Sequence, residues 1–330
     1  MSKRFIALGI LAVLAVGLCL FVACQPAANQ PADQTAAKPA EPAGTVRVSG
    51  AWALYPMMVR WAEEYNKVHP NIRIDVSAGG AGKGAADALA KLVDIGMVSR
   101  AIKAEETAQG AFFVPVVKDA VFPTINSANP LVAKGLAEKG IKRQVFVDLY
   151  INKKELTWGD VIGVPVKDKV QVYTRSDSCG AAETWALYLG AKAQEALQGI
   201  GVYGDPGVAE AVRRDPMGLG FNNLNFAFDP KTGEPLPGIM VPPIDINENG
   251  KVDPEEMLSP KANAIKAVVS GVYPSPPARD LNLMTKDKFE GAAKDFVRWI
   301  LTDGQKFVDE VGYIKLTDQS LADNLTKIGQ

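Results

Sequence analysis

From residue 45 onward, short apolar strands alternate with helices along the chain. Residues 45–49 and 71–77 alternate apolar and polar side chains, as strands do, while residues 57–68 repeat apolar side chains at helical spacing. Residues 78–84 form a glycine-rich loop before a short helix expected at 85–92. Because repeated strand–loop–helix units build sheets covered by helices, the sequence predicts an α/β architecture with largely parallel sheets.

The N-terminus predicts export from the cytoplasm. Lys3 and Arg4 precede an apolar run at residues 5–22, and small Ala23 stands directly before Cys24. This pattern is typical of a signal peptide, residues 1–23, that is cut before a cysteine whose thiol and new amino group receive lipid. An uncleaved anchor is the alternative, because about 18 apolar residues could just span a bilayer. Either interpretation places the folded part in the cell envelope, outside the cytoplasmic membrane.

Composition restricts the function classes. Residues 24–44 contain no large apolar side chain after Cys24 and are rich in Ala, Pro and Gln, which predicts a flexible tether. The formal charge of −1 gives no reason to expect nucleic-acid binding. The single histidine, His69, argues against a His-rich metal centre. Cys179 is the one cysteine in the expected folded part, so no disulfide within the processed chain is expected.

Three strand-to-helix loops suit an anion. They are residues 50–54, 78–84 and 175–181, and each precedes an expected helix start. Helix N-termini carry free N–H groups and partial positive charge, which together favour a tetrahedral anion. Arg175 could add a charge-assisted, bidentate contact, and Arg100 is a second cationic candidate. The alternative is that glycine-rich loops of this kind occur in any α/β protein.

Several segments resemble the phosphate-binding protein family of ABC transporters. Ser-Gly-Ala-Trp-Ala-Leu-Tyr-Pro at 49–56 is similar to the family's first ligand loop, and Val-Asp-Ile-Gly-Met-Val-Ser-Arg at 93–100 to its second-strand motif. Residues 175–181 resemble the Arg-x-x-x-Ser-Gly-Thr anion loop. Met-Gly-Leu-Gly-Phe within residues 216–223 resembles the family's Gly-Ile-Gly-Tyr stretch. In all, seven such pieces occur in the family's order between residues 45 and 318.

The resemblance implies a type 2 periplasmic-binding fold. Two α/β domains, residues 45–121 plus 283–330 and residues 122–282, would be joined by two crossover strands near 122–126 and 279–283. The implied function is capture of an oxyanion, phosphate first, by a monomer that performs no chemistry and hands the ligand to the permease subunits. The implied ligand-binding residues are Ala53, Leu54, Ala81, Ser99, Arg100, Arg175, Cys179, Gly180 and Ala181.

The expected site departs from the family pattern by losing hydroxyl groups. Ala51, Trp52 and Ala53 offer only backbone and an indole, and Ser-Gly-Thr has become Cys-Gly-Ala at 179–181. A larger oxyanion, or an organic phosphate stacking on Trp52, would fit these losses, but packing of Trp52 between the domains is an equal alternative. Cys179 is either a small buried residue or an activated thiolate of an enzyme. A binding or adhesion module without a transporter is a further alternative.

Residues 245–256 match the twelve-residue calcium loop. Oxygen-bearing side chains fall at positions 1, 3, 5, 9 and 12, and Gly250 stands at position 6, where the loop turns sharply. Because no partner loop exists in the sequence, a bound Ca²⁺ would be structural. The alternative is a polar surface turn around Asn249 and Gly250. The expected ligands are Asp245, Asn247, Asn249, the Lys251 carbonyl, Asp253 and Glu256.

Overall fold

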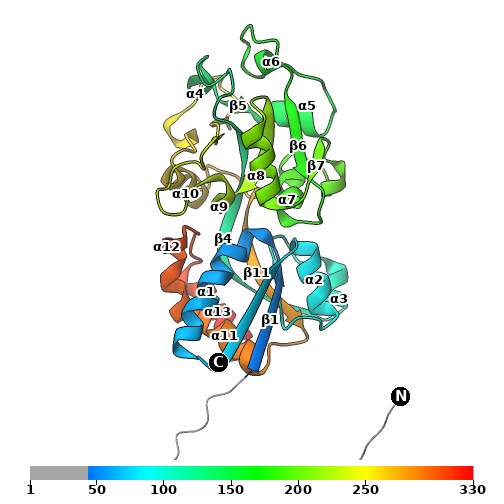
Figure 1. Ribbon diagram of the computed structural model, residues 1–330, viewed down its shortest axis with the longest axis vertical. Coiled ribbons are helices and arrows are strands. Elements are labelled where there is room, and N and C mark those ends of the chain that lie inside the picture. The colour runs from blue at the N-terminus through cyan, green and yellow to red at the C-terminus, as the bar shows by residue number, and fades with distance from the viewer. Residues whose placement is uncertain (1–43, 330) are drawn as a thin grey trace, which may run out of the picture. The chain divides into compact units, whose positions relative to one another are not determined.

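One continuous path of paired strands runs through the described residues, which are residues 44–329 of a computed structural model. The strand order is β2-β1-β3-β11-β4-β8-β6-β7, and β9 pairs with β4. Two hydrophobic cores lie along this path, one built from residues 46–117 and 281–328 and the other mainly from residues 120–278. We call the regions around these cores the first lobe and the second lobe (Figure 1).

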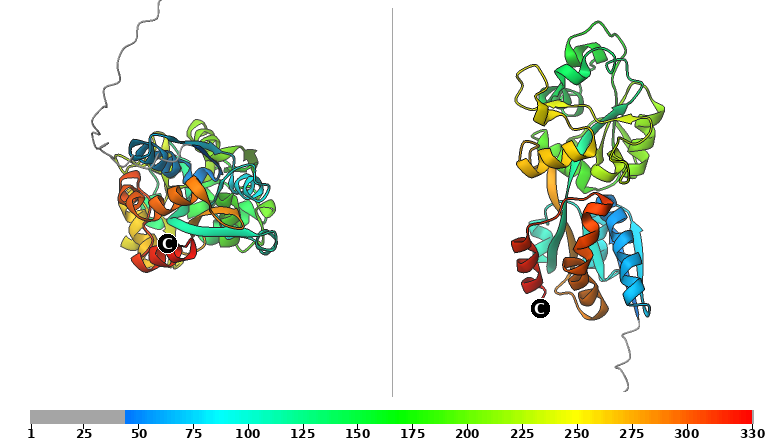
Figure 2. Two further views of the ribbon diagram at one scale, coloured as in Figure 1. Left: turned by 90° about the horizontal axis from the view of Figure 1, so that it is seen from below. Right: turned by 90° about the vertical axis from the view of Figure 1, so that its left-hand side faces the viewer.

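The first lobe places helices on both faces of its strands (Figure 1). Helices α11, α12 and α13, from the C-terminal end of the chain, pack beside α1 or one another, as Figure 2 also shows, and α2 packs on β1 and β3. Its elements are β1 (Gly44–Gly50), the 3-10 helix η1 (Trp52–Leu54), α1 (Tyr55–Val68), β2 (Ile72–Ala78), α2 (Ala81–Leu89), β3 (Ile95–Val98), α3 (Ala104–Ala108), α11 (Gly291–Leu301), η4 (Asp303–Phe307), α12 (Val308–Val311) and α13 (Asp318–Lys327).

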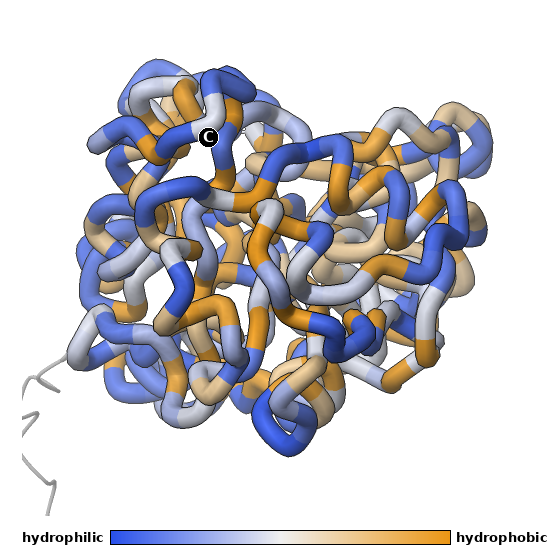
Figure 3. The backbone as a smooth tube through the Cα atoms, turned by 90° about the horizontal axis from the view of Figure 1, so that it is seen from above, coloured by the Kyte–Doolittle hydropathy of each residue, from blue (hydrophilic) through white to orange (hydrophobic). Residues whose placement is uncertain are grey.

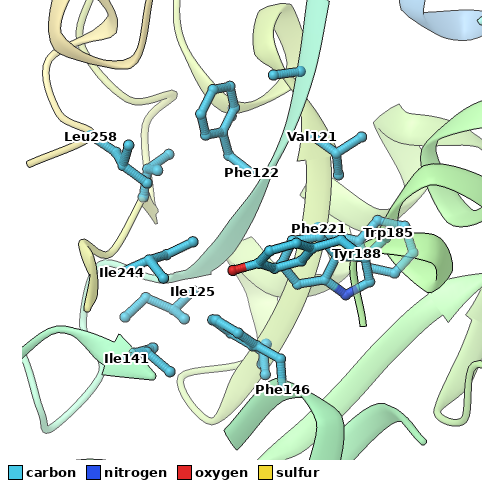
Figure 4. Packing of buried hydrophobic residues seen from close by; sticks show 14 of the residues in the cluster. Val121, Phe122, Ile125, Ile141, Phe146, Trp185, Tyr188, Phe221, Ile244 and Leu258 are labelled. Carbon is cyan, nitrogen blue, oxygen red and sulfur yellow. The ribbon is translucent and has the colours of Figure 1, made fainter. Parts of the chain in front are cut away.

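The second lobe is built around an aromatic cluster. The rings of Trp185 and Phe221 stack with centroids 5.7 Å apart, and Phe146 meets Trp185 edge-on at 5.3 Å (Figure 4). Its elements are α4 (Leu136–Lys139), β5 (Ile141–Lys142), α5 (Arg143–Tyr150), α6 (Trp158–Ile162), β6 (Gln171–Arg175), α7 (Gly180–Tyr188), η2 (Gln194–Ala196), β7 (Ile200–Val202), α8 (Gly204–Arg214), β8 (Gly218–Asn223), α9 (Leu224–Ala227), β9 (Ile239–Met240), β10 (Ile244–Asp245), η3 (Pro254–Glu256) and α10 (Lys261–Ser270).

Two long strands join the lobes. β4 (Ala111–Asn126) and β11 (Ala278–Lys286) pair antiparallel from Ala120 opposite Ala278 to Ala111 opposite Lys286. The two cores divide between residues 117 and 120 on β4 and between residues 278 and 281 on β11. These points lie within a few residues of the crossings expected at 122–126 and 279–283.

The sheet is less uniformly parallel than the sequence predicts. β1 pairs parallel with β2 and β3, and β6 pairs parallel with β7 and β8, so the outer strands follow the expectation. β4 and β11 instead run antiparallel to their neighbours β3 and β8 and to each other. The difference arises because these two strands pass between the lobes in opposite directions, which strand–helix alternation does not reveal.

The glycine-rich segment after β2 becomes helical at Ala81, so the helix start predicted at residue 85 is wrong. Helix α2 begins at Ala81, directly after Gly80, whose φ of +91° is readily adopted only by glycine. Position 84 lies inside the helix and needs glycine, because the Cβ atom of any other residue would lie 2.8 Å from the Cα of Gly50. Close packing of α2 on β1 and β3 therefore explains a glycine pattern that resembles a loop.

The backbone in Figure 3 has hydrophilic residues in many of its peripheral loops. Among residues 44–329, no helix combines the length and the apolar character that crossing a bilayer requires. The expected signal peptide and Cys24 lie outside the described residues.

Candidate functional site

The three strand-to-helix loops that the sequence singles out meet where the two lobes touch. Gly82, in the first turn of α2, donates its backbone N–H to the carbonyl oxygen of Ser178 at 3.1 Å. A Cβ atom on Gly80 would lie 2.5 Å from that same oxygen, and one on Gly180 would overlap the carbonyl oxygen of Ser99. Glycine at these positions lets the backbones of the two lobes come into direct contact.

The first loop supplies an indole at this junction. Trp52 opens η1, and its ring lies against Gly204 and meets the Tyr203 ring edge-on, with centroids 6.1 Å apart. Its Nε1–H is buried and has no hydrogen-bond partner among the described residues. The Trp52 ring therefore packs between the two lobes, which is one of the two alternatives considered for it. Its N–H group has no acceptor there among residues 44–329 and could still donate a hydrogen bond to a ligand.

Ala53 and Leu54 are both buried in the same short helix. The Ala53 carbonyl accepts a hydrogen bond from the Tyr313 hydroxyl at 2.6 Å, and the Leu54 N–H donates to the Ala51 carbonyl at 3.2 Å. The Leu54 amide, expected to contact the ligand, is therefore engaged in closing its own turn.

The second loop leads into α2, whose first residue is Ala81. The N–H groups of Gly79 and Gly80 both donate to the Gly50 carbonyl, at 2.9 and 3.0 Å, which fixes the loop on the end of β1. Ala81 is fully buried, and the amides of this first helical turn have no partner within the helix. One of them, from Gly82, is the group that bonds across the lobes to Ser178.

The third loop leads into α7, with Cys179 as its N-cap and Gly180 and Ala181 as its first two residues. The Cys179 Sγ accepts a hydrogen bond from the Ala182 N–H at 3.4 Å, as a hydroxyl cap would. Burial raises the pKa of the Cys179 thiol to about 12, against the weaker opposing effect of Arg175. At neutral pH this residue is a neutral, buried thiol.

Arg175 ends β6 with a fully buried side chain that is bound to two carboxylates. Its Nε and Nη2 donate to the two oxygens of Asp177 at 2.7 and 2.6 Å, and its Nη1 donates to Asp205 Oδ2 at 2.6 Å. The bidentate contact expected of Arg175 is thus made within the protein. Burial disfavours the charged guanidinium, but Asp205, Cys179 and Asp177 together raise the pKa of Arg175.

Ser99 and Arg100 follow β3 and are both buried. Arg100 forms a bidentate pair with Glu106, at 3.0 and 2.6 Å, so its charge is also balanced inside the first lobe. The Ser99 hydroxyl lies beside the α-carbon of Gly180, where the lobes touch. Of these two residues, Ser99 is therefore the one at the junction.

Sequence reasoning missed the buried acids of this region. Asp205 lies 30 residues from Arg175 and also accepts the Asn223 N–H at 3.0 Å, so it ties the start of α8 to the end of β8. Asp119 on β4 lies 3.4 Å from Arg279 on β11, and burial raises the pKa of its carboxyl to about 6. Of these acids, only Asp177 could have been found from the sequence, because it lies two residues from its partner Arg175.

The expected calcium ligands lie in the second lobe, between β10 and η3. Asp245 and Glu256 are buried, whereas Asn249 and Lys251 are exposed. Within residues 44–329, no three His, Cys, Asp or Glu side chains are already gathered as a metal site. Cys24, the expected lipid attachment point, lies outside the described part of the chain.

Comparison with known proteins finds similarity over most of the chain. A model of the PBP superfamily domain matches residues 35–304. The phosphate-binding protein PstS of Methanocaldococcus jannaschii is 28% identical, over 89% of this chain and 88% of that protein. The phosphate-binding protein PstS of Xylella fastidiosa (strain Temecula1) is 26% identical, over 87% of this chain and 86% of that protein.

Solved structures show the same fold. A putative phosphate ABC transporter substrate-binding protein from Clostridium perfringens, with bound phosphate, superposes with a TM-score of 0.66 at 21% identity, covering 83% of this chain and all of that one. An ABC-type phosphate transport receptor from Vibrio cholerae gives a TM-score of 0.59 at 18% identity, covering 82% and 100%. The α/β architecture, with its two lobes and paired crossing strands, is therefore that of periplasmic phosphate-binding proteins.

Proposed function

The chain belongs to the PBP superfamily, and on that basis we propose that it captures an oxyanion, phosphate first, and delivers it to the permease of an ABC transporter. The relatives named above as phosphate-binding proteins and the solved phosphate receptors support this assignment. The observation that carries it is the meeting of three loop-to-helix starts, η1, α2 and α7, at the junction of the two lobes.

The donors at this junction suit a small anion rather than a large one. The first-turn amides of α2 and α7, the Ser99 hydroxyl and the Trp52 Nε1–H all lie at the junction of the lobes. Arg175 has five N–H groups and uses three on Asp177 and Asp205, which leaves two. These donors replace the hydroxyls that the sequence lacks, and helix dipoles add partial positive charge.

The lobes act as a clamp in this proposal. The bond from Gly82 to Ser178 crosses from one lobe to the other and belongs to the state in which the lobes lie together. An anion that bonds to both α2 and α7 then favours the state in which the lobes lie together. β4 and β11, which join the lobes, are the strands about which such a motion would occur.

The environment of Cys179, the only cysteine of the described residues, agrees with a protein that binds its ligand without catalysing a reaction. Cys179 is 4% exposed, and its thiol, with a pKa raised to about 12 by burial, is not a nucleophile at neutral pH. The enzyme alternative therefore finds no activated group here. An organic phosphate stacked on Trp52 is also disfavoured, because Gly204 and Tyr203 already lie against that indole.

Anchoring to the membrane through Cys24 completes the proposal. The small residue before Cys24 and the apolar run at residues 5–22 support export and lipidation. A lipid-held receptor stays close to the permease that it serves.

Calorimetry tests the function directly. Full-length protein, purified in detergent, is titrated with phosphate, sulfate, arsenate, molybdate, tungstate and simple phosphate esters. The proposal expects one phosphate per chain, bound more tightly than sulfate or any ester. Tight binding of another oxyanion with none of phosphate would reassign the ligand, and no binding of any of them would overturn the function.

A further inference from the structure

The loop at residues 245–256 is held firmly at its ends and in the middle. Ile244 and Leu258 flank it and are both buried in the core of the second lobe, on the same side of the cluster as Ile141 (Figure 4). β10 pairs with β5, and the Val252 N–H donates to the Glu138 carbonyl at 2.7 Å. A polar segment held this way presents its side chains in a defined arrangement.

Side-chain oxygens of the loop turn back toward its own backbone. Asp245 Oδ2 accepts the Gly250 N–H at 2.9 Å, and Asn247 Oδ1 accepts the Asn249 N–H at 3.0 Å. Gly250 has a φ of +85°, a conformation that other residues rarely adopt, so the sharp turn at position 6 is present. The loop therefore already has the curled course that a cation site of this length requires.

An unpartnered carboxylate oxygen marks a place that suits a cation. Asp245 is fully buried, and its Oδ1 has no hydrogen-bond partner among the described residues. The other oxygen of the same carboxylate bonds to Gly250, so the group faces the loop. A buried negative oxygen without a partner is strongly unfavourable unless a positive charge compensates it.

The other two acidic ligands, Asp253 and Glu256, accept hydrogen bonds from the loop itself, and a metal ion could take the place of these donors. Glu256 Oε1 accepts the N–H groups of Ile246 and Asn247, at 2.8 and 3.1 Å. Asp253 Oδ2 accepts from the side-chain amides of Asn247 and Asn249, and its Oδ1 pairs with Lys251 at 3.0 Å.

We propose that this loop binds one Ca²⁺ as a structural ion. Asp245 supplies the first ligand through its free oxygen, and side-chain rotation brings Asp253 and Glu256 to the same ion. Three carboxylates exceed the charge of the ion by one, and the amide and carbonyl oxygens complete an all-oxygen shell that calcium prefers. The further ligands are Asn247, Asn249 and the Lys251 carbonyl.

Calcium suits this loop better than magnesium. A twelve-residue loop of mixed carboxylate, amide and carbonyl oxygens offers the six to eight ligands of calcium, whereas magnesium requires a tighter octahedron and keeps several waters. The ion would fasten β10 and η3 to each other, at the edge where β10 pairs with β5. This role is separate from oxyanion capture and does not rest on it.

The test is a calcium titration in phosphate-free buffer. Full-length protein in detergent, freed of metal by chelator, is titrated with CaCl₂ and with MgCl₂ by calorimetry. Asp245→Asn is the informative variant, because asparagine keeps an oxygen for the Gly250 N–H and removes the ligand charge. Glu255→Gln, at the exposed neighbouring position, is the matched control.

The parent and Glu255→Gln should bind one Ca²⁺ with a dissociation constant of about 10⁻³ M or tighter, and Mg²⁺ more weakly. Asp245→Asn should bind Ca²⁺ about tenfold more weakly or worse, as loss of a supporting group at a metal site does. It should bind phosphate as the parent does. Equal calcium affinity in Asp245→Asn, or no calcium binding by the parent, would overturn the proposal, and neither result bears on oxyanion capture.

Discussion

Nη1 of Arg175 lies 2.6 Å from Oδ2 of Asp205, and neither side chain has any exposed surface. Asp177 holds the opposite edge of the same guanidinium, so one buried cation serves two buried anions. This triad ties the third loop to the start of α8. Arg175 is consequently as much a part of the core of the second lobe as of the candidate site.

Replacing Arg175 by Ala should therefore affect folding as well as binding. Two carboxylates would be left buried without their cation, which costs about 3–5 kcal/mol in the free energy of unfolding. Urea denaturation of the parent and the variant measures this loss. Arg73→Ala, which breaks an exposed pair with Asp75, is the control and should cost about 0–1 kcal/mol. A loss for Arg175→Ala no larger than the control would contradict the role of the triad.

Adding a methyl group at Gly180 should hinder closure of the lobes. The new Cβ would overlap the Ser99 carbonyl across the junction, whereas Gly44→Ala meets nothing within 4 Å and serves as control. Overpacking of about 1–3 kcal/mol corresponds to phosphate binding weakened by about 5- to 150-fold. Calorimetry measures the affinity, and the free energy of unfolding shows whether each variant is intact. Parent-like affinity in Gly180→Ala would show that ligand binding does not need this contact.

Asp119 should make stability depend on pH. Burial raises the pKa of its carboxyl to about 6 in the folded chain, above about 3.9 in the unfolded chain, so the folded state holds this proton more tightly. Its contribution to stability is complete below pH 4 and is lost as the pH rises through 6. The stability difference between the parent and Asp119→Asn should thus change by about 2 kcal/mol between pH 4 and pH 7. A constant difference across that range would show that Asp119 titrates normally.

Cys179 should resist alkylation in the folded protein. Its thiol is buried and, with a pKa raised to about 12, is not ionised at pH 8. Iodoacetamide should leave the peptide containing Cys179 unmodified in native protein and modify it fully in urea, as read by mass spectrometry. Rapid native modification with loss of phosphate binding would revive the enzyme alternative.

Cys24→Ser should change the cellular fate of the chain. Without a thiol to carry lipid, the protein should leave the membrane fraction or keep its signal peptide uncut. Fractionation and mass measurement distinguish these outcomes, and Cys179→Ser is the control that should remain anchored. A processed, membrane-bound Cys24→Ser protein would count against lipidation at this position.

The sequence alone determined the features that depend on neighbouring residues. Alternating apolar residues set β1 and β2, and helical spacing set α1. The loops at 78–84 and 175–181 were recognisable because helix starts need particular residues within a few positions. The spacing of oxygens at 245–256 is likewise a local property, because all of the residues concerned lie within twelve positions of one another.

Only the tertiary structure decided which partners those residues have. Arg175 meets Asp205 across 30 positions because α8 packs on β6, and Asp119 meets Arg279 across 160 because β4 and β11 pair antiparallel between the lobes. Local periodicity carries no information about such pairs, since they arise when elements far apart in the sequence pack together. For the same reason the antiparallel crossings, the engaged Arg175 and the direct contact of Gly82 with Ser178 followed from packing alone.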